Sequence, residues 1–284
     1  MDDLQKSFKV SERRACQVLG QPRSSQRYES HAADDEPRLL ARIFELVQKF
    51  PRYGYRTITK KLRREGWTVN FKRIYRLWRR EGLRVPKKQR KTRHSGRSEN
   101  ACDIRKADHP DDVWAWDFVF DRTSNGTALK WLMIIDEFTR ENLCLHVDRS
   151  ITSEEVINQL TNLFATRGLP NFIRSDNGPE FTANVISVWL EQLGLDVLYI
   201  APGSPWQNGY AESFNSRFRD EFLSLEEFDS LRTAKRLTCR HREEYNRHRP
   251  HSSLDDLTPN EFASQWPASV AVAALPSLQR ATAT

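Results

Sequence analysis

The sequence lacks the features that mark secreted, membrane-spanning or zinc-binding proteins. Its four cysteines are widely spaced and form no CxxC pair, so neither a zinc knuckle nor a disulfide framework is indicated. No apolar run reaches the length of a membrane span. The first thirty residues contain no apolar segment typical of a signal peptide, and there is no internal repeat. We therefore expect a soluble globular protein in the reducing cytoplasm.

Positive charge is in excess, and it is concentrated in one segment. Residues 51–106 contain 20 Lys and Arg but 4 Asp and Glu, a local net charge of +16, whereas the whole 284-residue chain carries +7. The remainder of the chain is therefore acidic, at −9. This division predicts a region that binds a polyanion, joined to a part that uses carboxylates. A solubilising charged surface is the plainer alternative.

Helical patterns dominate residues 1–85, which we expect to form a helical DNA-binding region. Residues 11–28 indicate two short basic helices with Ser11 as an N-cap, either a small helix-turn-helix or plain amphipathic helices. Apolar residues recur at helical spacing through 37–50, and two more short helices flank Gly66. This last pair is a helix-turn-helix candidate, with a solvated helical hairpin as the alternative. Its second helix carries the predicted phosphate contacts Lys72, Arg73, Arg76, Arg79 and Arg80.

Hydrophobic periodicity disappears over residues 86–108, where we expect a basic linker and a domain boundary. Lys87, Lys88 and Arg90 would follow a DNA backbone there. Beyond the linker, strands and helices are expected in the order strand, strand, strand, helix, strand, helix, strand, helix, helix. Their ranges are 113–121, 129–136, 141–148, 152–168, 171–176, 183–193, 196–201, 210–223 and 229–247. This order predicts an α/β domain over residues 109–265, with a mixed sheet covered by helices and a flexible tail at 266–284.

Three acidic residues in this domain stand out from their surroundings. Asp117 interrupts the aromatic strand WAWDFVF, where Asp is disfavoured. Asp176 ends a strand and opens a turn, a position where α/β sheets place ligand-contacting groups. Glu212 lies in the first turns of a helix, where the helix dipole alone would also favour it. Three converging carboxylates suit phosphodiester chemistry, because they can hold two divalent ions about 3.5–4 Å apart.

The motifs around these acids resemble a known family. Five blocks carry the resemblance: WAWDF (114–118), IIDEFTR (134–140), SDNGPEF (175–181), PGSPWQNGYAESFN (202–215) and YNRHRPHSSLDDLTPNEF (245–262). Residues 108–265 resemble the integrase core of retroviral integrases and DDE transposases. Within that group they resemble the orfB product of bacterial two-frame insertion sequences. The 35 residues between Asp176 and Glu212 match the family's DD(35)E spacing.

This resemblance implies a ribonuclease-H-like five-stranded sheet and a DNA transposase. It implies that Asp117, Asp176 and Glu212 bind two Mg²⁺ ions, with Mn²⁺ as a substitute, and catalyse DNA 3′-end cleavage and strand transfer. Arg219, seven residues after Glu212, stands where the family has Lys or Arg and would contact a DNA phosphate. The family also implies a homo-oligomer on element ends and target DNA, associated with the bacterial nucleoid. An upstream-frame protein or fusion is implied as well, because this chain has no sustained heptads.

Several further residues have competing interpretations. Trp206 and Gln207 are candidate contacts to an unpaired base at the DNA end, with packing against the sheet as the alternative. Asp136 ends a strand and is considered as a supporting acid or a metal ligand. Three histidines among arginines indicate a polar helix end more than a metal site: His241, His248 and His251. A nuclease that does not transpose, and a DNA-binding regulator that does not cleave, remain alternative functions.

Overall fold

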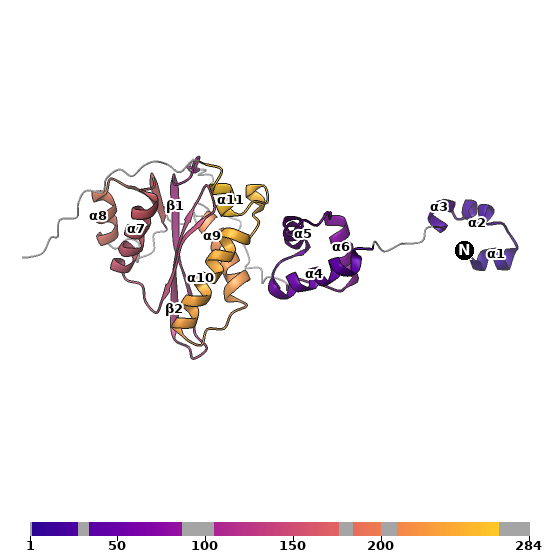
Figure 1. Ribbon diagram of the computed structural model, residues 1–284, viewed down its shortest axis with the longest axis horizontal. Coiled ribbons are helices and arrows are strands. Elements are labelled where there is room, and N and C mark those ends of the chain that lie inside the picture. Colours follow the sequence, from indigo (N-terminus) through magenta and orange to yellow (C-terminus); the bar gives the residue numbers. More distant parts are fainter. Residues whose placement is uncertain (1, 28–33, 87–104, 176–183, 200–208, 267–284) are drawn as a thin grey trace, which may run out of the picture. The chain divides into compact units, whose positions relative to one another are not determined.

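The computed structural model describes residues 2–27, 34–86, 105–175, 184–199 and 209–266 (Figure 1). The chain divides into two compact units, residues 1–49 and 50–284. None of the helices in these described ranges is both long and apolar enough to cross a membrane. The expected domain boundary at 86–108 stays a prediction, because most of that segment lies outside the described residues.

The described residues of the first unit contain helices and no strand. The helices are α1 (Asp2–Phe8), α2 (Glu12–Val18), α3 (Arg23–Gln26) and α4 (Glu36–Lys49). Ser11 caps α2 as predicted, because its side chain accepts the backbone N–H of Arg14. In α4, Leu39, Ile43 and Leu46 are buried. The periodicity expected through 37–50 predicts that Phe44 joins this apolar face, but Phe44 is 45% exposed, so that part of the prediction is wrong.

The second unit begins with the helix pair predicted around Gly66. Helix α5 (Tyr55–Arg64) is followed by α6 (Phe71–Arg80), and Gly66 between them has the left-handed φ of +91° that favours glycine. Asn70 caps α6 by accepting the backbone N–H of Arg73. The buried side chains of the pair include Ile58, Leu62, Ile74, Leu77 and Trp78. Helical spacing predicts that Tyr75 is buried beside Ile74 and Trp78, but Tyr75 is 44% exposed and packs on the ring of Tyr55.

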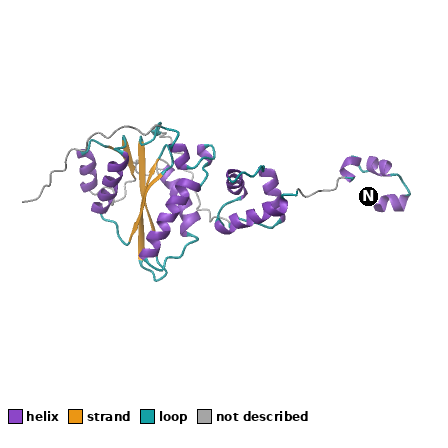
Figure 2. Cartoon of the chain, in the orientation of Figure 1, coloured by secondary structure: helices purple, strands orange, loops and turns teal. Residues whose placement is uncertain are grey.

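A five-stranded mixed sheet forms the centre of the catalytic part of this unit, in the order β3-β2-β1-β4-β5 (Figure 2). The strands are β1 (Val113–Arg122), β2 (Ala128–Asp136), β3 (Asn142–Asp148), β4 (Phe172–Ser175) and β5 (Asp196–Tyr199). The first three pair antiparallel, whereas β4 pairs parallel to both β1 and β5. This confirms the expected α/β, ribonuclease-H-like fold class and places β1 in the middle of the sheet.

Helices cover both faces of this sheet (Figure 1). Helices α7 (Ser153–Arg167) and α8 (Asn184–Gln192) pack on one face around Trp114, Phe164 and Ile173. The Thr152–Glu155 capping box begins α7 as predicted. The opposite face packs against α9 (Gly209–Phe218) and α10 (Leu231–His248). The short elements η3 (Ser252–Leu254) and α11 (Pro259–Ala263), which the sequence did not suggest, end the described chain.

Helix α9 continues without a break into a π-helical turn, η2 (Arg219–Leu223). The backbone N–H of Ser224 donates to the carbonyl of Arg219, five residues earlier. Such wider turns are uncommon and are frequent at functional sites. Phe218 and Phe222, on either side of the junction, are both buried against the core that contains Trp131.

Candidate active site

Asp117 lies in the middle of β1 and faces the side of the sheet covered by α9. Because side chains alternate along a strand, Asp117 shares a face with Ala115 and Val119, which both pack in the α9 core. Its carboxylate is half-buried, and one oxygen, Oδ1, accepts the backbone N–H of Phe118 at 2.7 Å. A carboxylate therefore interrupts an otherwise apolar row at the point where α9 crosses the sheet.

Asn215 joins this carboxylate to the helix that carries Glu212. Its Nδ2 donates to Asp117 Oδ2 at 2.5 Å, although 98 residues separate the two. Asn215 is 8% exposed and lies three residues after Glu212, one helical turn away. Glu212 itself is exposed and makes no hydrogen bond or ion pair within the described part of the chain. The structure thus places two of the three predicted acids around one helix–strand contact.

Sequence reasoning missed Asn215, although it quoted the motif that contains it. The signal was available, because a polar amide three residues after a candidate acid shares its helix face. Asp176, the remaining predicted acid, lies outside the described residues, as do Trp206 and Gln207.

Asp136 has a structural task. It is fully buried, and its carboxylate accepts the backbone N–H groups of Asp111 (2.7 Å), Phe138 (2.7 Å) and Thr139 (3.0 Å). Burial raises the pKa of Asp136 to about 6, and the three backbone donors oppose that rise. Its oxygens are committed to the turn between β2 and β3, so the interpretation of Asp136 as a metal ligand gains no support.

A buried ion pair lies beside this turn. Glu137 and Arg174 meet at 2.8 Å, with side chains 0% and 5% exposed. Burial raises the pKa of Glu137 to about 7 in spite of the nearby guanidinium. Arg174 pairs in register with Ala115 of β1, so this charge pair lies on the same side of the sheet as Asp117.

Two of the three histidines are packed among aromatic rings, so the polar helix end expected for them is wrong. His241 lies 4.6 Å from the ring of Phe222, between centroids, and desolvation lowers its pKa to about 3. His251 is 2% exposed and meets Tyr245 edge-on at 4.9 Å; burial, followed by the charge of Arg249, lowers its pKa to about 2. Neither is placed with other ligands in a metal site.

Two clusters of possible metal ligands occur in the described ranges, and neither contains the predicted acids. They are Asp108–His109–Asp112 and His146–Asp148–Glu155. Both have ordinary structural partners: Asp112 pairs with Arg105 at 3.1 Å, and Glu155 closes the capping box of α7. Asp117 and Glu212 therefore remain the candidate metal ligands.

The predicted phosphate contacts on α6 are available at the surface. Lys72, Arg76, Arg79 and Arg80 are exposed and Arg73 is half-buried, whereas the opposite side of the helix is in the core. Arg219 is also exposed, at the start of the π-helical turn. Lys87, Lys88 and Arg90 lie outside the described residues.

The basic residues of α5 and the turn before it serve a different purpose. Ion pairs connect them with acids in the C-terminal part of the same unit: Arg52–Asp220, Lys60–Asp256, Lys61–Glu244 and Arg64–Glu261. The Lys61–Glu244 pair measures 2.8 Å, and both side chains are at most one-quarter exposed. Part of the local charge of +16 is therefore neutralised by ion pairs within the protein, whereas most of the cations of α6 are exposed.

Family models match both parts of the chain. Residues 107–205 and 193–259 each match a model described as an integrase core domain, and residues 33–91 match one described as an HTH-like domain. A solved structure of the HTLV-2 integrase catalytic core domain in complex with magnesium aligns with 56% of this chain and 99% of its own, at 15% identity and a TM-score of 0.45.

Insertion-element proteins resemble the chain over most of its length. An uncharacterized 39.2 kDa protein of element IS476 from Xanthomonas euvesicatoria is 39% identical over 90% of this chain and 73% of its own. The uncharacterized 31.7 kDa protein of IS407 from Burkholderia multivorans is 38% identical over 93% and 95%. Transposase InsD of IS2 from Escherichia coli is 29% identical over 81% and 80%. This chain belongs to the family of bacterial insertion-sequence transposases, with an integrase core domain and a preceding HTH-like domain.

Proposed function

We propose that the chain catalyses Mg²⁺-dependent cleavage at the 3′ end of its element and then strand transfer into target DNA. The observation that carries this proposal is the contact between Asp117 and Asn215, which holds the helix of Glu212 against the strand of Asp117. Asp is unfavourable in the middle of an apolar strand face, so its presence at position 117 favours a functional role.

Strand register supports the inclusion of Asp176. Phe172 pairs with Val113, and the residues that follow stay in step along the two parallel strands. The same numbering offset between the two strands, applied to Asp117, gives residue 176, directly after the end of β4. We therefore propose that the third carboxylate belongs with the other two.

The donor groups fit a divalent metal of the magnesium type. Mg²⁺ takes carboxylate oxygens and keeps several waters or phosphate oxygens, so it requires few protein ligands and an open side. Glu212 offers an exposed carboxylate without a partner in the described chain, and the Asn215 amide orients that of Asp117. When bound, such ions supply charge stabilisation for the phosphoryl oxygens and a more reactive hydroxyl.

The remaining roles concern DNA. The exposed cations of α6 would hold duplex phosphates, and Arg219 would hold a phosphate close to the acids. Two successive reactions at one site, hydrolysis and then attack by the freed 3′-hydroxyl, require the DNA end to stay bound between them. We propose that more than one copy acts together, because two element ends must be held.

The decisive experiment compares Glu212→Gln with Glu227→Gln. Both changes remove one exposed carboxylate with little change of shape, but Glu227 lies outside the proposed site. Cleavage and strand transfer should disappear in the first variant and persist in the second, assayed with element-end DNA and Mg²⁺ or Mn²⁺. Full cleavage by Glu212→Gln would refute the catalytic assignment. Cleavage by the unmodified chain without joined product would favour a nuclease.

A further inference from the structure

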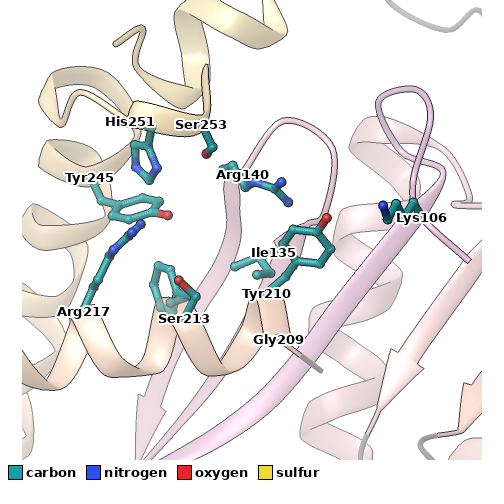
Figure 3. Close-up of a pocket in the computed structure, with 11 residues that line it drawn as sticks. Lys106, Ile135, Arg140, Gly209, Tyr210, Ser213, Arg217, Tyr245, His251 and Ser253 are labelled. Carbon is teal, nitrogen blue, oxygen red and sulfur yellow. The ribbon is translucent and has the colours of Figure 1, made fainter. Parts of the chain in front are cut away.

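A second site lies on the other side of α9 from Glu212. A cavity of about 430 Å³ is bounded by α9, by the turn after β2 and by the segment that follows α10 (Figure 3). This volume is in the range of pockets that hold small ligands, roughly 300–1,000 Å³. Three of the sequence blocks that carry the family resemblance supply its walls, yet the proposed catalytic acids do not use it.

The charge of this cavity is one-sided. Lys106, Arg140 and Arg217 line it, and no carboxylate does among the described residues. Lys106 and Arg217 make no ion pair or hydrogen bond with another described residue. Desolvation, followed by the charge of Arg249, lowers the pKa of Arg217, whereas Glu221 acts in the opposite direction.

A tyrosine hydroxyl is directed into the same space. Tyr245 is 5% exposed, and its hydroxyl points into the cavity without a hydrogen-bond partner in the described chain (Figure 3). Its ring is fixed by edge-on contacts with Phe214 and His251, both 4.9 Å between centroids. The cavity therefore contains a rigidly held donor beside its cationic side chains.

Arg140 and Tyr210 form the opposite wall. The guanidinium carbon lies 3.9 Å from the centre of the Tyr210 ring. Arg140 has a left-handed backbone φ of +64° and donates to the carbonyl of Glu137. Such a conformation is unfavourable for a residue with a side chain and persists where the surroundings hold it in place. Together with Tyr245, this wall offers aromatic faces as well as charge.

We propose that this cavity binds one unpaired nucleotide of a DNA strand, with its phosphate held by Arg140, Arg217 and the Tyr245 hydroxyl. Aromatic faces beside a basic groove are the usual means of holding single-stranded DNA. A volume of about 430 Å³ is in the range that suits a ligand of the size of one nucleotide. The inference rests on the proposed function, because it assumes that the chain acts on DNA. The nucleotide would lie across α9 from the acids, about one helix diameter, roughly 10–12 Å, away.

The test removes one group at a time from the full-length chain. Arg217→Gln removes an unpaired charge, and Tyr245→Phe removes one oxygen while keeping the ring contacts. Arg236→Gln is the matched control, because Arg236 is exposed on α10 away from the cavity. Binding of a ten-nucleotide single strand is measured by fluorescence anisotropy without metal, across salt concentrations. Thermal shifts with thymidine 5′-monophosphate and with inorganic phosphate are measured in parallel.

Arg217→Gln should weaken single-strand binding about tenfold and reduce the salt slope by about 0.7, the contribution of one phosphate contact. Tyr245→Phe should weaken single-strand binding several-fold. Arg236→Gln should change both the affinity and the salt slope less than Arg217→Gln does. Thymidine monophosphate should stabilise the unmodified chain more than Arg217→Gln. If phosphate stabilises the chain while the variants bind the single strand as tightly as the unmodified chain, the cavity binds a free anion and not DNA, and the proposal is overturned. Equal behaviour of Arg217→Gln and Arg236→Gln would also overturn it.

These results are independent of the catalytic test. Strand binding is measured without metal, so an active Glu212→Gln would refute the proposed catalytic site and leave the cavity result standing. Conversely, loss of cleavage in Glu212→Gln with unchanged strand binding in Arg217→Gln would refute the cavity alone.

Discussion

Replacement of Asn215 by Ala should separate the positioning of Asp117 from the stability of the fold. The amide donates to a carboxylate, and hydrogen bonds to charged groups contribute about 1.5–3 kcal/mol. Asp117 is half-buried, so water can replace the donor and the loss falls at the lower end. The Oδ1 atom of Asn215 is buried without a hydrogen-bond partner, so its removal offsets part of that loss. We expect a net decrease of at most about 1.5 kcal/mol in the free energy of unfolding.

The catalytic effect should be much larger. In the variant the Asp117 carboxylate keeps the Phe118 N–H but loses the amide that orients Oδ2, and loss of a group that orients a ligand typically weakens metal binding or activity about 10–100-fold. The Mg²⁺ concentration for half-maximal DNA cleavage should therefore rise by that factor in Asn215→Ala. Cleavage at saturating Mg²⁺ should recover in part, which a role in direct chemistry would not allow.

Asn246→Ala is the matched control. The Asn246 amide also joins a helix to the sheet, accepting the backbone N–H of Asn142 and donating to its carbonyl, both at 2.9 Å. Its loss should destabilise the fold by about 1–3 kcal/mol without changing the Mg²⁺ requirement. Urea unfolding and metal titration of both variants test the reasoning. If Asn215→Ala keeps the wild-type Mg²⁺ requirement, the Asn215 contact holds α9 against the sheet but does not position Asp117.

Three further predictions concern stability and DNA binding. The pKa of His241 is about 3 in the folded state, below its value of 6.5 in the unfolded chain. The contribution of His241 to the free energy of unfolding should therefore be complete above pH 6.5 and fall by at most about 2 kcal/mol at pH 5. Urea unfolding at several pH values should show a smaller loss in His241→Phe. Phe218→Ala should cost about 3–5 kcal/mol, because Phe218 is 1% exposed in the core, and a smaller value by urea unfolding would contradict its packing. Neutralising Lys72, Arg76 and Arg79 singly should lower the salt slope of duplex binding by about 0.9 each; an unchanged slope would exclude α6 from the interface.

The strands of the catalytic part were predictable because their signal is local. β1 was expected at 113–121 and occupies Val113–Arg122, since apolar and aromatic side chains fill both faces of a central strand. The capping box from Thr152 to Glu155 is likewise a local signal, four residues long. Contacts such as Lys61–Glu244 were not predictable, because a sequence separation of 183 leaves no local trace of their pairing.

His241 shows a different kind of failure. Ala234, Thr238 and Tyr245 of α10 are buried, and His241 completes the same helical spacing. The period was present in the sequence, but histidine was counted among the polar residues. Its ring has an apolar body that packs on Phe222, and the cost of burying a neutral imidazole is small. Counting histidine as amphipathic would have predicted its packing against Phe222.

The architecture of α9 links the two sites assigned to it. One side of the helix, with Phe214 and Phe218, is buried in the core, so the helix cannot roll without opening a cavity there. A second side carries Glu212, and a third carries Arg217 at the wall of the basic cavity. A nucleotide held by Arg217 and a metal ion held by Glu212 would therefore be spaced by one rigid helix. The position of the DNA strand relative to the metal would then be set by the fold itself, before any target DNA arrives.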